Sequence, residues 1–261
     1  MIIDGKAIAS RRLEILRNKI QETKINPKLA IVMVTGDPAT EIYVRLKCKA
    51  AAKVGIVTEV VDTIDKVSPD ADGIIVQLPY PNQDEVIAKI PIDKDVDGLR
   101  ESSPFLPATV KAILTVIENV IPAKAGIYLN RFRVEPGMTY VIVGQGKLVG
   151  KPLADYLEKQ NYNVIRCDIN TQNLKEKTLK GDVLVSATGV DGLITADMVK
   201  PAMPAGRQGA IVIDCGSPKA EVDFEKVKNI ASAITPVPGG VGPLTVISLL
   251  ENLIEAVKIT E

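Results

Sequence analysis

Short apolar runs alternate along this chain with segments in which apolar residues recur at the spacing of a helix. The runs, each typical of a buried strand, cover residues 29–34, 57–61, 73–78, 140–143, 163–167, 183–187, 210–214 and 232–234. Helical spacing covers residues 7–20, 38–54, 84–90, 107–120, 149–160, 195–199 and 245–257. Because such strands alternate with helices, the sequence predicts an α/β fold with parallel sheets. A polar, irregular stretch at 122–136 separates two series of these elements, so we expect two domains.

The composition indicates a globular chain without a strong overall electric field. Of 261 residues, 46% are hydrophobic and 25% are charged, and 32 basic side chains balance 32 acidic ones. We therefore expect neither a nucleic acid nor a membrane as a partner. No apolar run reaches the length of a membrane span, no signal-peptide pattern begins the sequence, and Cys48, Cys167 and Cys215 are widely spaced. These features predict a cytoplasmic protein with reduced thiols.

The sequence contains no histidine, which limits the chemistry that the chain can perform. Ser-His-Asp and Cys-His catalysis are excluded, and so are nearly all zinc sites, so we expect no metal. Proton transfer near neutral pH must then use a lysine, a cysteine, a tyrosine or a carboxylate with a shifted pKa.

The segment 235–245, Thr-Pro-Val-Pro-Gly-Gly-Val-Gly-Pro-Leu-Thr, combines three prolines with three glycines. Proline restricts φ and glycine removes the side chain, so the segment is stiff and lets a flat molecule lie against bare backbone. A flexible linker would also carry serine and charge, and this segment carries neither. We interpret it as a ligand-facing loop rather than a structural corner.

A glycine-rich turn at residues 144–146 and the residues that end two later strands suggest a dinucleotide site. Gly150 follows the turn one place later than the dinucleotide fingerprint requires, so the turn alone is weak evidence. Asp168, however, ends the next strand where a carboxylate binds the ribose hydroxyls of NAD and repels the 2′-phosphate of NADP. We therefore favour NAD over NADP. The predicted cofactor-binding residues are Gly144, Gln145, Gly146, Asp168, Thr188 and Gly189. Tight packing for the turn and a solvated strand end for Asp168 are the alternatives.

Several polar residues of the first half are of types that transfer protons. Tyr43 and Lys47 lie four residues apart, hence on one face of a helix. Gln77 is a single amide at the end of an apolar strand, and Asp95 and Asp97 share one turn. From the residues alone, each of these is more often structural than catalytic.

Six ordered motifs closely resemble those of the methylenetetrahydrofolate dehydrogenase/cyclohydrolase family. They are the tyrosine–lysine helix and residues 76–79, 94–98, 149–152, 186–189 and 235–245. The resemblance implies a catalytic folate-binding domain of residues 1–118 and 243–261, to which the C-terminal helix returns. It also implies an NAD(P)-binding Rossmann-like domain of residues 119–242, a cleft that holds folate and cofactor, and a homodimer.

The resemblance further implies an activity and the residues that perform it. The enzyme would oxidise 5,10-methylenetetrahydrofolate to 5,10-methenyltetrahydrofolate by hydride transfer to NAD(P), and then hydrolyse the product to 10-formyltetrahydrofolate. The implied catalytic residues are Lys47 as the acid–base group, Gln77, which holds it, and Tyr43. The implied folate contacts are Tyr43, Asp97, Pro238 and Gly239, and the implied nicotinamide contacts are Thr109, Gly242 and Thr245.

Departures from the family pattern bear on these expectations. The family usually has Arg-Ser in place of Gln145-Gly146 and His-Ser in place of Asp168-Ile169, so groups expected to hold a 2′-phosphate are absent. Residues 107–112 keep only the Pro and the Thr of the family's Pro-Cys-Thr-Pro-x-Gly. Between Ile56 and Gly73 the chain is shorter than family members, and a helix is expected to be missing there.

Two other functions stay open. A monofunctional NAD-dependent methylenetetrahydrofolate dehydrogenase would lack the hydrolytic step. Lys47 and Gln77 argue against it, because hydride transfer alone needs no proton shuttle there. A non-catalytic NAD-binding sensor module is the second alternative, since a fold does not guarantee an activity.

Overall fold

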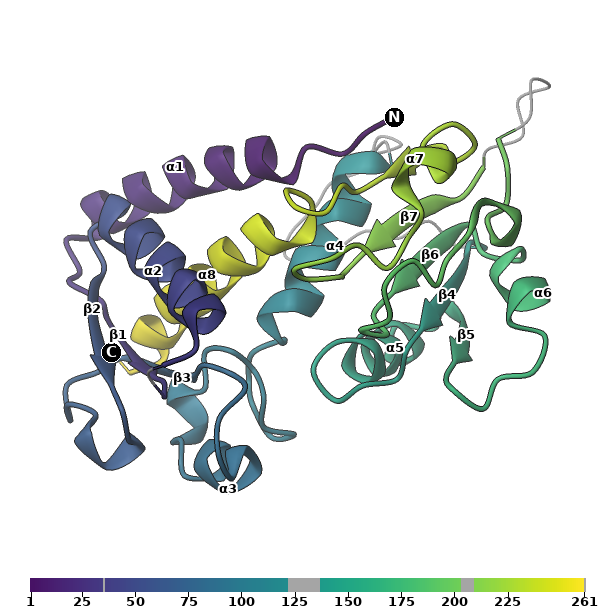
Figure 1. Cartoon of the computed structure of the whole chain (residues 1–261). Coiled ribbons are helices and arrows are strands. Elements are labelled where there is room, and N and C mark those ends of the chain that lie inside the picture. The colour runs from purple at the N-terminus through teal and green to yellow at the C-terminus, as the bar shows by residue number, and fades with distance from the viewer. Residues whose placement is uncertain (35, 122–136, 203–208, 261) are drawn as a thin grey trace. The chain divides into compact units, whose positions relative to one another are not determined.

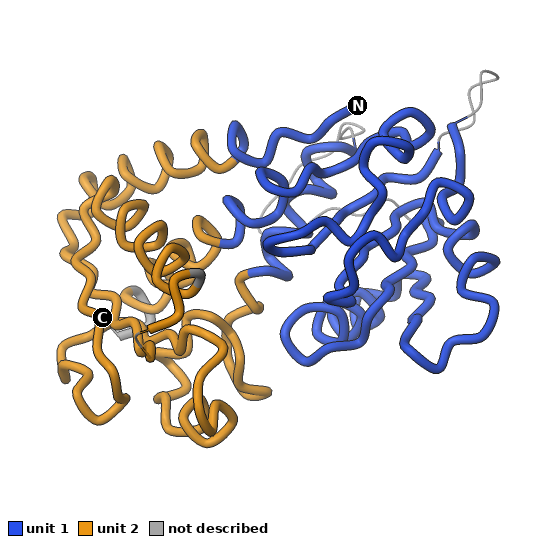
Figure 2. The backbone as a smooth tube through the Cα atoms, in the orientation of Figure 1, with its two compact units in different colours: residues 1–8, 109–245 blue, residues 9–108, 246–261 orange. Residues whose placement is uncertain are grey.

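The computed structural model describes residues 1–34, 36–121, 137–202 and 209–260 (Figure 1). The irregular stretch expected at 122–136 therefore lies outside the described residues. The chain forms two compact units, named here after their sheets (Figure 2). The three-stranded unit holds residues 9–108 and 246–261, and the five-stranded unit holds residues 1–8 and 109–245. Both sheets are parallel and both units contain helices, so the predicted α/β class is confirmed.

The sheet of the three-stranded unit consists of β1 (Lys28–Val32), β2 (Val57–Val61) and β3 (Gly73–Val76), in the order β2-β1-β3. All strand pairs are parallel, and Leu29 of the central strand lies opposite Thr58 and Gly73. The apolar residues of β1 and the whole of β3 are buried, as expected for parallel strands covered on both faces. β2 is an edge strand and leaves two residues exposed.

Helices and 3₁₀ turns surround this sheet. They are α1 (Gly5–Thr23), α2 (Pro38–Lys53), η1 (Ile64–Lys66), α3 (Gln83–Ala88), η2 (Ile92–Lys94) and α8 (Val241–Thr260). Helix α8 packs on β3 so closely that a Cβ on Gly73 would lie 2.7 Å from Leu253. Arg12 of α1 holds α8 by two 2.8 Å contacts with the carboxylate of Glu251. The implied return of the C-terminal helix to the first half is confirmed.

Helix α8 begins four residues earlier than the apolar pattern predicted, at Val241 instead of Thr245. Pro243 fits this earlier start, because the first N–H groups of a helix have no intrahelical partner to lose. The loop part of the proline–glycine segment is therefore confined to residues 235–240.

The connection from β2 to β3 contains η1 and no α-helix. A crossover between parallel strands usually includes a helix, and the shortened segment predicted that one would be missing. Side chains fasten the connection instead. Glu59 accepts hydrogen bonds from the N–H and the hydroxyl of Ser68 at 2.9 and 2.6 Å, and Tyr80 donates to the carbonyl of Asp62 at 2.6 Å.

The sheet of the five-stranded unit is also entirely parallel, in the order β5-β4-β6-β7-β8. Its strands are β4 (Thr139–Val143), β5 (Asn163–Cys167), β6 (Val183–Ser186), β7 (Ile211–Asp214) and β8 (Ala233–Ile234). Its helical elements are α4 (Ala108–Val120), α5 (Gly150–Lys159), α6 (Leu174–Thr178), η3 (Ala196–Met198) and α7 (Phe224–Val227). Ile2 pairs with Ile234, so the first residues of the chain extend this sheet beyond β8.

The predictions from the apolar pattern were wrong for the shortest helical elements. The helix expected at 195–199 is the 3₁₀ turn η3, and Pro201, which follows soon after, disfavours a longer helix. Helices α6 and α7 were not expected, because five and four residues are too few to show a helical period.

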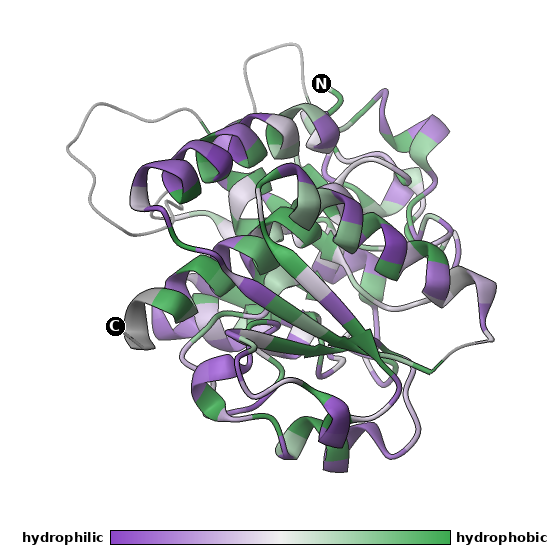
Figure 3. Ribbon diagram, turned by 90° about the vertical axis from the view of Figure 1, so that its left-hand side faces the viewer, coloured by the Kyte–Doolittle hydropathy of each residue, from purple (hydrophilic) through white to green (hydrophobic). Residues whose placement is uncertain are grey.

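The core of the five-stranded unit joins neighbouring strands to the elements packed on them. Val141, Leu184 and Val212 come from β4, β6 and β7, and Val227 of α7 joins them in one buried cluster. In Figure 3 the helices carry both hydrophobic and hydrophilic colour. Within the described part of the chain, no helix is long and apolar enough to span a bilayer.

Candidate active site

Helix α2 starts at a cap that fixes the direction of its side chains. The carboxylate of Asp37 accepts a hydrogen bond from the Thr40 N–H at 2.9 Å, and Pro38 occupies the first helical position. Tyr43 and Lys47 follow on one face of the helix, one turn apart.

The ammonium group of Lys47 meets the amide that ends β3. Its Nζ donates to Gln77 Oε1 at 2.9 Å. The amide nitrogen of Gln77 donates to the carbonyl of Leu78 at 3.0 Å, and its backbone N–H donates to Val32 of β1 at 2.8 Å. Because both the backbone and the side chain of Gln77 are held, its oxygen stays directed at the lysine. The structure thus brings together two residues that the sequence singled out 30 positions apart.

The turn that follows η2 gives its two carboxylates different surroundings. Asp95 is fully buried and accepts hydrogen bonds from the N–H groups of Leu99 and Arg100 at 3.3 and 2.9 Å. Its carboxylate therefore holds the turn together. Asp97 is half-buried, and its charge interacts with that of Lys47. Asp97, and not Asp95, belongs with Lys47 and Gln77 in what we call the lysine cluster.

Burial shifts the pKa values of the two charged groups of the lysine cluster in opposite directions. It lowers the pKa of Lys47, although the charge of Asp97 acts to raise it. It raises the pKa of Asp97, although the charge of Lys47 acts to lower it. A lysine whose pKa is lowered yields its proton closer to neutral pH, so the cluster has the equipment for proton transfer.

Two further residues of the three-stranded unit contribute to this site. Tyr43 is 40% exposed and presents an aromatic ring, suited to stacking on a flat ligand, one turn before Lys47. Asn252 of α8 is buried, and its amide donates to the carbonyls of Val96 and Leu106 at 2.9 and 3.0 Å. It therefore holds the segment that carries Asp97. Sequence reasoning missed Asn252, since one asparagine in an apolar helix resembles any other break in the pattern.

The turn between β4 and α5 uses its glycines for different purposes. Gly144 has a φ of +94°, and a Cβ there would lie 2.1 Å from the carbonyl oxygen of Ala187. A Cβ on Gly150 would lie 1.8 Å from the carbonyl oxygen of Gly144. Gly146, by contrast, has open space where a Cβ would stand. Two glycines thus permit close packing, and Gly146 leaves room for a ligand beside the N-terminus of α5.

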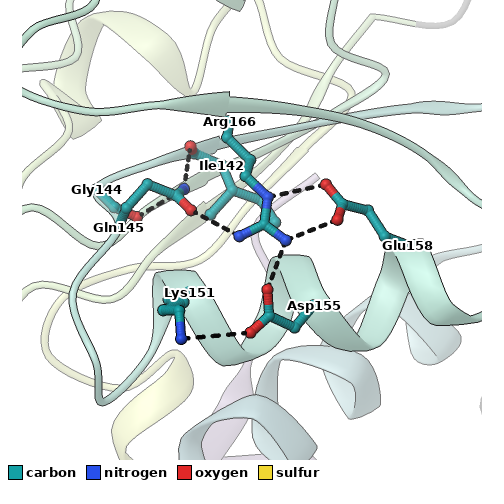
Figure 4. Close-up of polar contacts among 7 residues, drawn as sticks. All are labelled: Ile142, Gly144, Gln145, Lys151, Asp155, Glu158 and Arg166. Atoms are coloured by element: carbon teal, nitrogen blue, oxygen red, sulfur yellow. Dashed lines mark hydrogen bonds and ion pairs between the residues drawn. The ribbon is translucent and has the colours of Figure 1, made fainter.

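Gln145 folds back onto this turn instead of extending from it (Figure 4). Its amide nitrogen donates to the carbonyls of Ile142 and Gly144, both at 3.1 Å. Its oxygen accepts a 3.4 Å hydrogen bond from the guanidinium of Arg166 on β5. The side chain of Gln145 therefore acts as part of the scaffold of the turn.

Two carboxylates of α5 hold the guanidinium of Arg166 (Figure 4). Glu158 accepts from Nε and Nη2 at 2.8 and 2.7 Å, and Asp155 accepts from Nη2 at 2.6 Å. These contacts raise the pKa of Arg166 far above its ordinary value. The arginine nearest the glycine turn is thus already paired twice. Sequence reasoning did not predict these pairings.

Asp168 stands exposed just after β5. Its Oδ1 accepts hydrogen bonds from the Asn170 N–H and the Thr171 hydroxyl, both at 3.0 Å. This local turn fixes the carboxylate without covering it. The next residue, Ile169, is 99% exposed, so an apolar side chain also faces solvent at this strand end.

The remaining predicted cofactor contacts lie in three segments of the five-stranded unit. Thr188 and Gly189 follow β6, and their N–H groups donate to the buried carboxylate of Glu221 at 2.7 and 2.8 Å. Thr109 lies at the start of α4, and the hydroxyl of Thr245 bonds back to the carbonyl of Val241 at 3.3 Å.

The proline–glycine loop packs against the start of the chain. A Cβ on Gly5 would lie 1.9 Å from the carbonyl oxygen of Gly240, so only glycine fits there. Gly239 has a φ of +114° and follows Pro238 at the tip of the loop. Gly242 has open space where its side chain would be.

These observations fit a dinucleotide at the five-stranded sheet. Gly146, Gly189 and Gly242 each leave open space where a Cβ would stand, so a flat molecule can approach the backbone closely. The first two of these glycines follow adjacent parallel strands, β4 and β6, at the edge where ligands of such sheets bind. Together with the lysine cluster, this defines the class of the protein: an α/β enzyme with a nucleotide-binding unit.

The comparison with known families identifies the particular family. The catalytic-domain model of tetrahydrofolate dehydrogenase/cyclohydrolase matches residues 3–97, and the NAD(P)-binding-domain model of the same family matches residues 107–261. The chain belongs to the tetrahydrofolate dehydrogenase/cyclohydrolase family. The resemblance seen in the six motifs is thereby confirmed.

Relatives and solved structures agree with this assignment over nearly the full length. The chain is 40% identical to a bifunctional protein FolD of Methanospirillum hungatei, covering 97% of this chain and 95% of the relative, and 37% identical to that of Aquifex aeolicus, covering 99% and 95%. The bifunctional FolD structure from Campylobacter jejuni is similar with a TM-score of 0.84 at 30% identity, covering 100% of this chain and 99% of that one. A Trypanosoma brucei enzyme, solved with NADP and an inhibitor, gives 0.84 at 26% identity and covers 100% and 98%.

Proposed function

We propose that this chain is a bifunctional enzyme of one-carbon metabolism. It oxidises 5,10-methylenetetrahydrofolate with NAD(P)⁺ to the 5,10-methenyl cation and reduced cofactor, and it then adds water to give 10-formyltetrahydrofolate and a proton. The lysine cluster carries this proposal, because the 2.9 Å contact from Lys47 to Gln77 serves proton transfer, which the second step requires. Bound NAD(P) would accept the hydride of the first step.

In the hydrolytic step, Lys47 is proposed to move the protons. Its neutral amine takes a proton from the water that attacks the methenyl carbon, and the resulting ammonium returns a proton as the ring C–N bond breaks. Gln77 holds the nitrogen of Lys47 in place. The charge of Asp97 helps the amine to accept a proton, while burial helps it to release one.

The folate contacts carried over from the family remain part of this proposal. Tyr43 stacks on the flat part of the folate, and Asp97 accepts hydrogen bonds from the N–H groups of the pterin. Pro238 and Gly239 are proposed to contact the same substrate. The catalytic domain is proposed as residues 1–118 with 243–261, and the NAD(P)-binding domain as residues 119–242.

For the coenzyme, the proposal favours NAD over NADP. The carboxylate of Asp168 suits two ribose hydroxyls and repels a 2′-phosphate. Arg166, the cation beside the turn, is held by Glu158 and Asp155 and is therefore less able to neutralise a phosphate. The proposed cofactor contacts are Thr109, Gly144, Gln145, Gly146, Asp168, Thr188, Gly189, Gly242 and Thr245.

The proposal also covers the assembly and the location of the protein. The family implies a homodimer, which light scattering on the purified protein would test. Cys48, Cys167 and Cys215 are all free, in keeping with a reducing cytoplasm.

One spectroscopic experiment separates the candidate functions. Purified protein is mixed with 5,10-methylenetetrahydrofolate and either NAD or NADP, and the absorbance bands of reduced nicotinamide and of the methenyl compound are followed together. The bifunctional enzyme gives reduced cofactor without lasting methenyl absorbance. A lasting methenyl band would favour the monofunctional dehydrogenase, and the absence of reduced cofactor would favour the sensor module.

A further inference from the structure

Glu221 is a buried carboxylate that the proposed reaction does not use. It is 3% exposed and lies in the segment between β7 and α7. Its backbone is held on both sides, because its carbonyl accepts from the Ile194 N–H at 2.9 Å and its own N–H donates to Asp214 Oδ1 at 3.2 Å. The backbone that carries this carboxylate is therefore fixed.

Among the described residues, this carboxylate accepts four hydrogen bonds, which come from the last residue of β6 and from the loop that follows it. Oε2 accepts from the Ser186 hydroxyl at 2.6 Å and from the hydroxyl and N–H of Thr188 at 2.8 and 2.7 Å. Oε1 accepts from the Gly189 N–H at 2.8 Å. Each oxygen faces a backbone donor. An amide cannot replace this arrangement, since its NH₂ group would face an N–H.

The loop that Glu221 holds also packs against the glycine turn between β4 and α5. A Cβ on Gly144 would lie only 2.1 Å from the carbonyl oxygen of Ala187, so the two backbones are in close contact. A displacement of residues 186–189 would therefore reach the backbone of the turn between β4 and α5.

A second carboxylate extends the connection to the proline–glycine loop. Asp214 accepts from the N–H groups of Gly216 and Val222 at 2.8 and 3.0 Å, in addition to that of Glu221. The Asp214 N–H donates to the hydroxyl of Thr235 at 2.8 Å, at the first residue of the proline–glycine loop. Asp214 and Thr235 are 2% and 1% exposed. The buried residues Glu221 and Asp214 thus connect the loop 186–189 to the proline–glycine loop.

We propose that Glu221 is a positioning residue for the dinucleotide, which sets the loop 186–189 and, through it, the glycine turn in the binding geometry. The proposal rests on the proposed function only in taking these segments as the cofactor site. Its test is therefore a measurement of NAD binding by titration calorimetry, which needs neither folate nor turnover.

The variants to compare are Glu221→Gln, Glu221→Asp and Ser186→Ala. Glu221→Gln should weaken NAD binding about tenfold or more, because a backbone N–H loses its charged acceptor. Glu221→Asp keeps the charge on a shorter side chain and should recover part of that loss. Ser186→Ala removes a hydroxyl donor but no backbone bond, and should leave the NAD affinity within about twofold.

A second measurement distinguishes positioning of the dinucleotide by Glu221 from a general role of Glu221 in stabilising the fold. Lys47 belongs to the other compact unit, so hydrolysis of 5,10-methenyltetrahydrofolate without cofactor should be unchanged in Glu221→Gln. Unchanged NAD affinity in Glu221→Gln would overturn the proposal, and so would equal losses of NAD affinity and hydrolysis. If Glu221→Gln does not fold, the comparison of Glu221→Asp with Ser186→Ala decides: equal NAD affinities would overturn it. Wild-type protein that binds NAD but lacks turnover would refute the proposed function and leave this inference intact.

Discussion

The two sheets share the order of three parallel strands but carry different chemical groups at the carboxyl ends of those strands. Strands β2-β1-β3 of one unit repeat the parallel order of β5-β4-β6 of the other. The likeness extends to a detail, since Asp72 and Asp182 each accept a 2.8 Å hydrogen bond from the N–H that begins the central strand, Lys28 in one sheet and Thr139 in the other. The same framework of three strands is thus built twice.

The difference lies in the residues at the carboxyl ends. Beyond β3, the polar groups are side chains: the amide of Gln77 with Lys47 and Asp97 around it. Beyond β4 and β6, glycine backbone is exposed and the side chains of Gln145 and Glu221 serve as supports. Side chains with shifted pKa values suit proton transfer, whereas open backbone suits a flat, charged cofactor. The comparison teaches that strand order alone decides neither function.

The largest expected effect comes from removing the amine of the lysine cluster. Lys47→Met should lower the hydrolysis of 5,10-methenyltetrahydrofolate about 10²–10⁴-fold, because the general acid–base group is lost. Lys49→Met changes an exposed lysine of the same helix and is the matched control. Hydrolysis by Lys47→Met at the rate of the control would remove Lys47 from the mechanism.

The next effect concerns the backbone of the five-stranded unit. Gly144→Ala should weaken NAD binding about 10²-fold, because a Cβ 2.1 Å from the Ala187 oxygen, at a φ of +94°, forces the turn to move. Gly146→Ala has open space for its methyl group and should preserve the fold of the turn. Calorimetry with NAD, together with the melting temperature of each variant, measures both. An NAD affinity of Gly144→Ala equal to that of the wild-type protein would show that the packing of Gly144 does not shape the site.

A double substitution tests the reading of the ribose site. Asp168→Ser with Gln145→Arg should shift the ratio of kcat/KM values towards NADP by about tenfold or more, since one change removes a repulsive charge and the other adds a cation. Adding Glu158→Gln and Asp155→Asn should increase the shift, because Arg166 loses both carboxylate partners. An unchanged ratio in both variants would mean that another element reads the ribose.

The charge of Asp97 gives a pH prediction for the lysine cluster. Hydrolysis requires neutral Lys47, so kcat should rise with pH through the pKa of this lysine. Burial lowers that pKa and Asp97 raises it, so Asp97→Asn should move the rising part of the pH profile of kcat to lower pH. Asp93→Asn alters an exposed carboxylate nearby and should leave the profile in place. A shift to higher pH in Asp97→Asn would contradict the coupling.

The smallest effect is expected at the support of the lysine cluster. Asn252→Ala removes two hydrogen bonds from the segment that carries Asp97 and should lower the free energy of unfolding by about 1–3 kcal/mol. Denaturant unfolding measures this change. A loss below about 0.5 kcal/mol would mean that the segment is held by other contacts.

Local patterns in the sequence were enough to locate the elements that carry the candidate site. The glycine turn, the Tyr43–Lys47 face and the amide of Gln77 each follow from spacing or from the end of an apolar run. Parallel sheets followed from the alternation of strands and helices. The shortened connection before β3 was also visible, because family resemblance gave a length to compare.

The supports of the sites were not visible, for a physical reason. Asn252 acts on residues 146 and 156 positions away, and Glu221 acts on residues 32 to 35 positions away. No local period marks such a residue, because its partners are assigned by the fold. The same reason explains why the residues alone did not distinguish Asp95 from Asp97, a choice that came from the family resemblance: only the folded turn commits one carboxylate to backbone N–H groups.

The division of chemistry between the two units is tested most directly by a crossed comparison of Lys47→Met and Glu221→Gln. Each variant is assayed twice, for hydrolysis of 5,10-methenyltetrahydrofolate without cofactor and for NAD affinity by calorimetry. Lys47→Met should lose hydrolysis and keep NAD affinity, and Glu221→Gln should do the reverse. Loss of both properties in either variant would contradict the assignment of proton transfer to one unit and cofactor binding to the other.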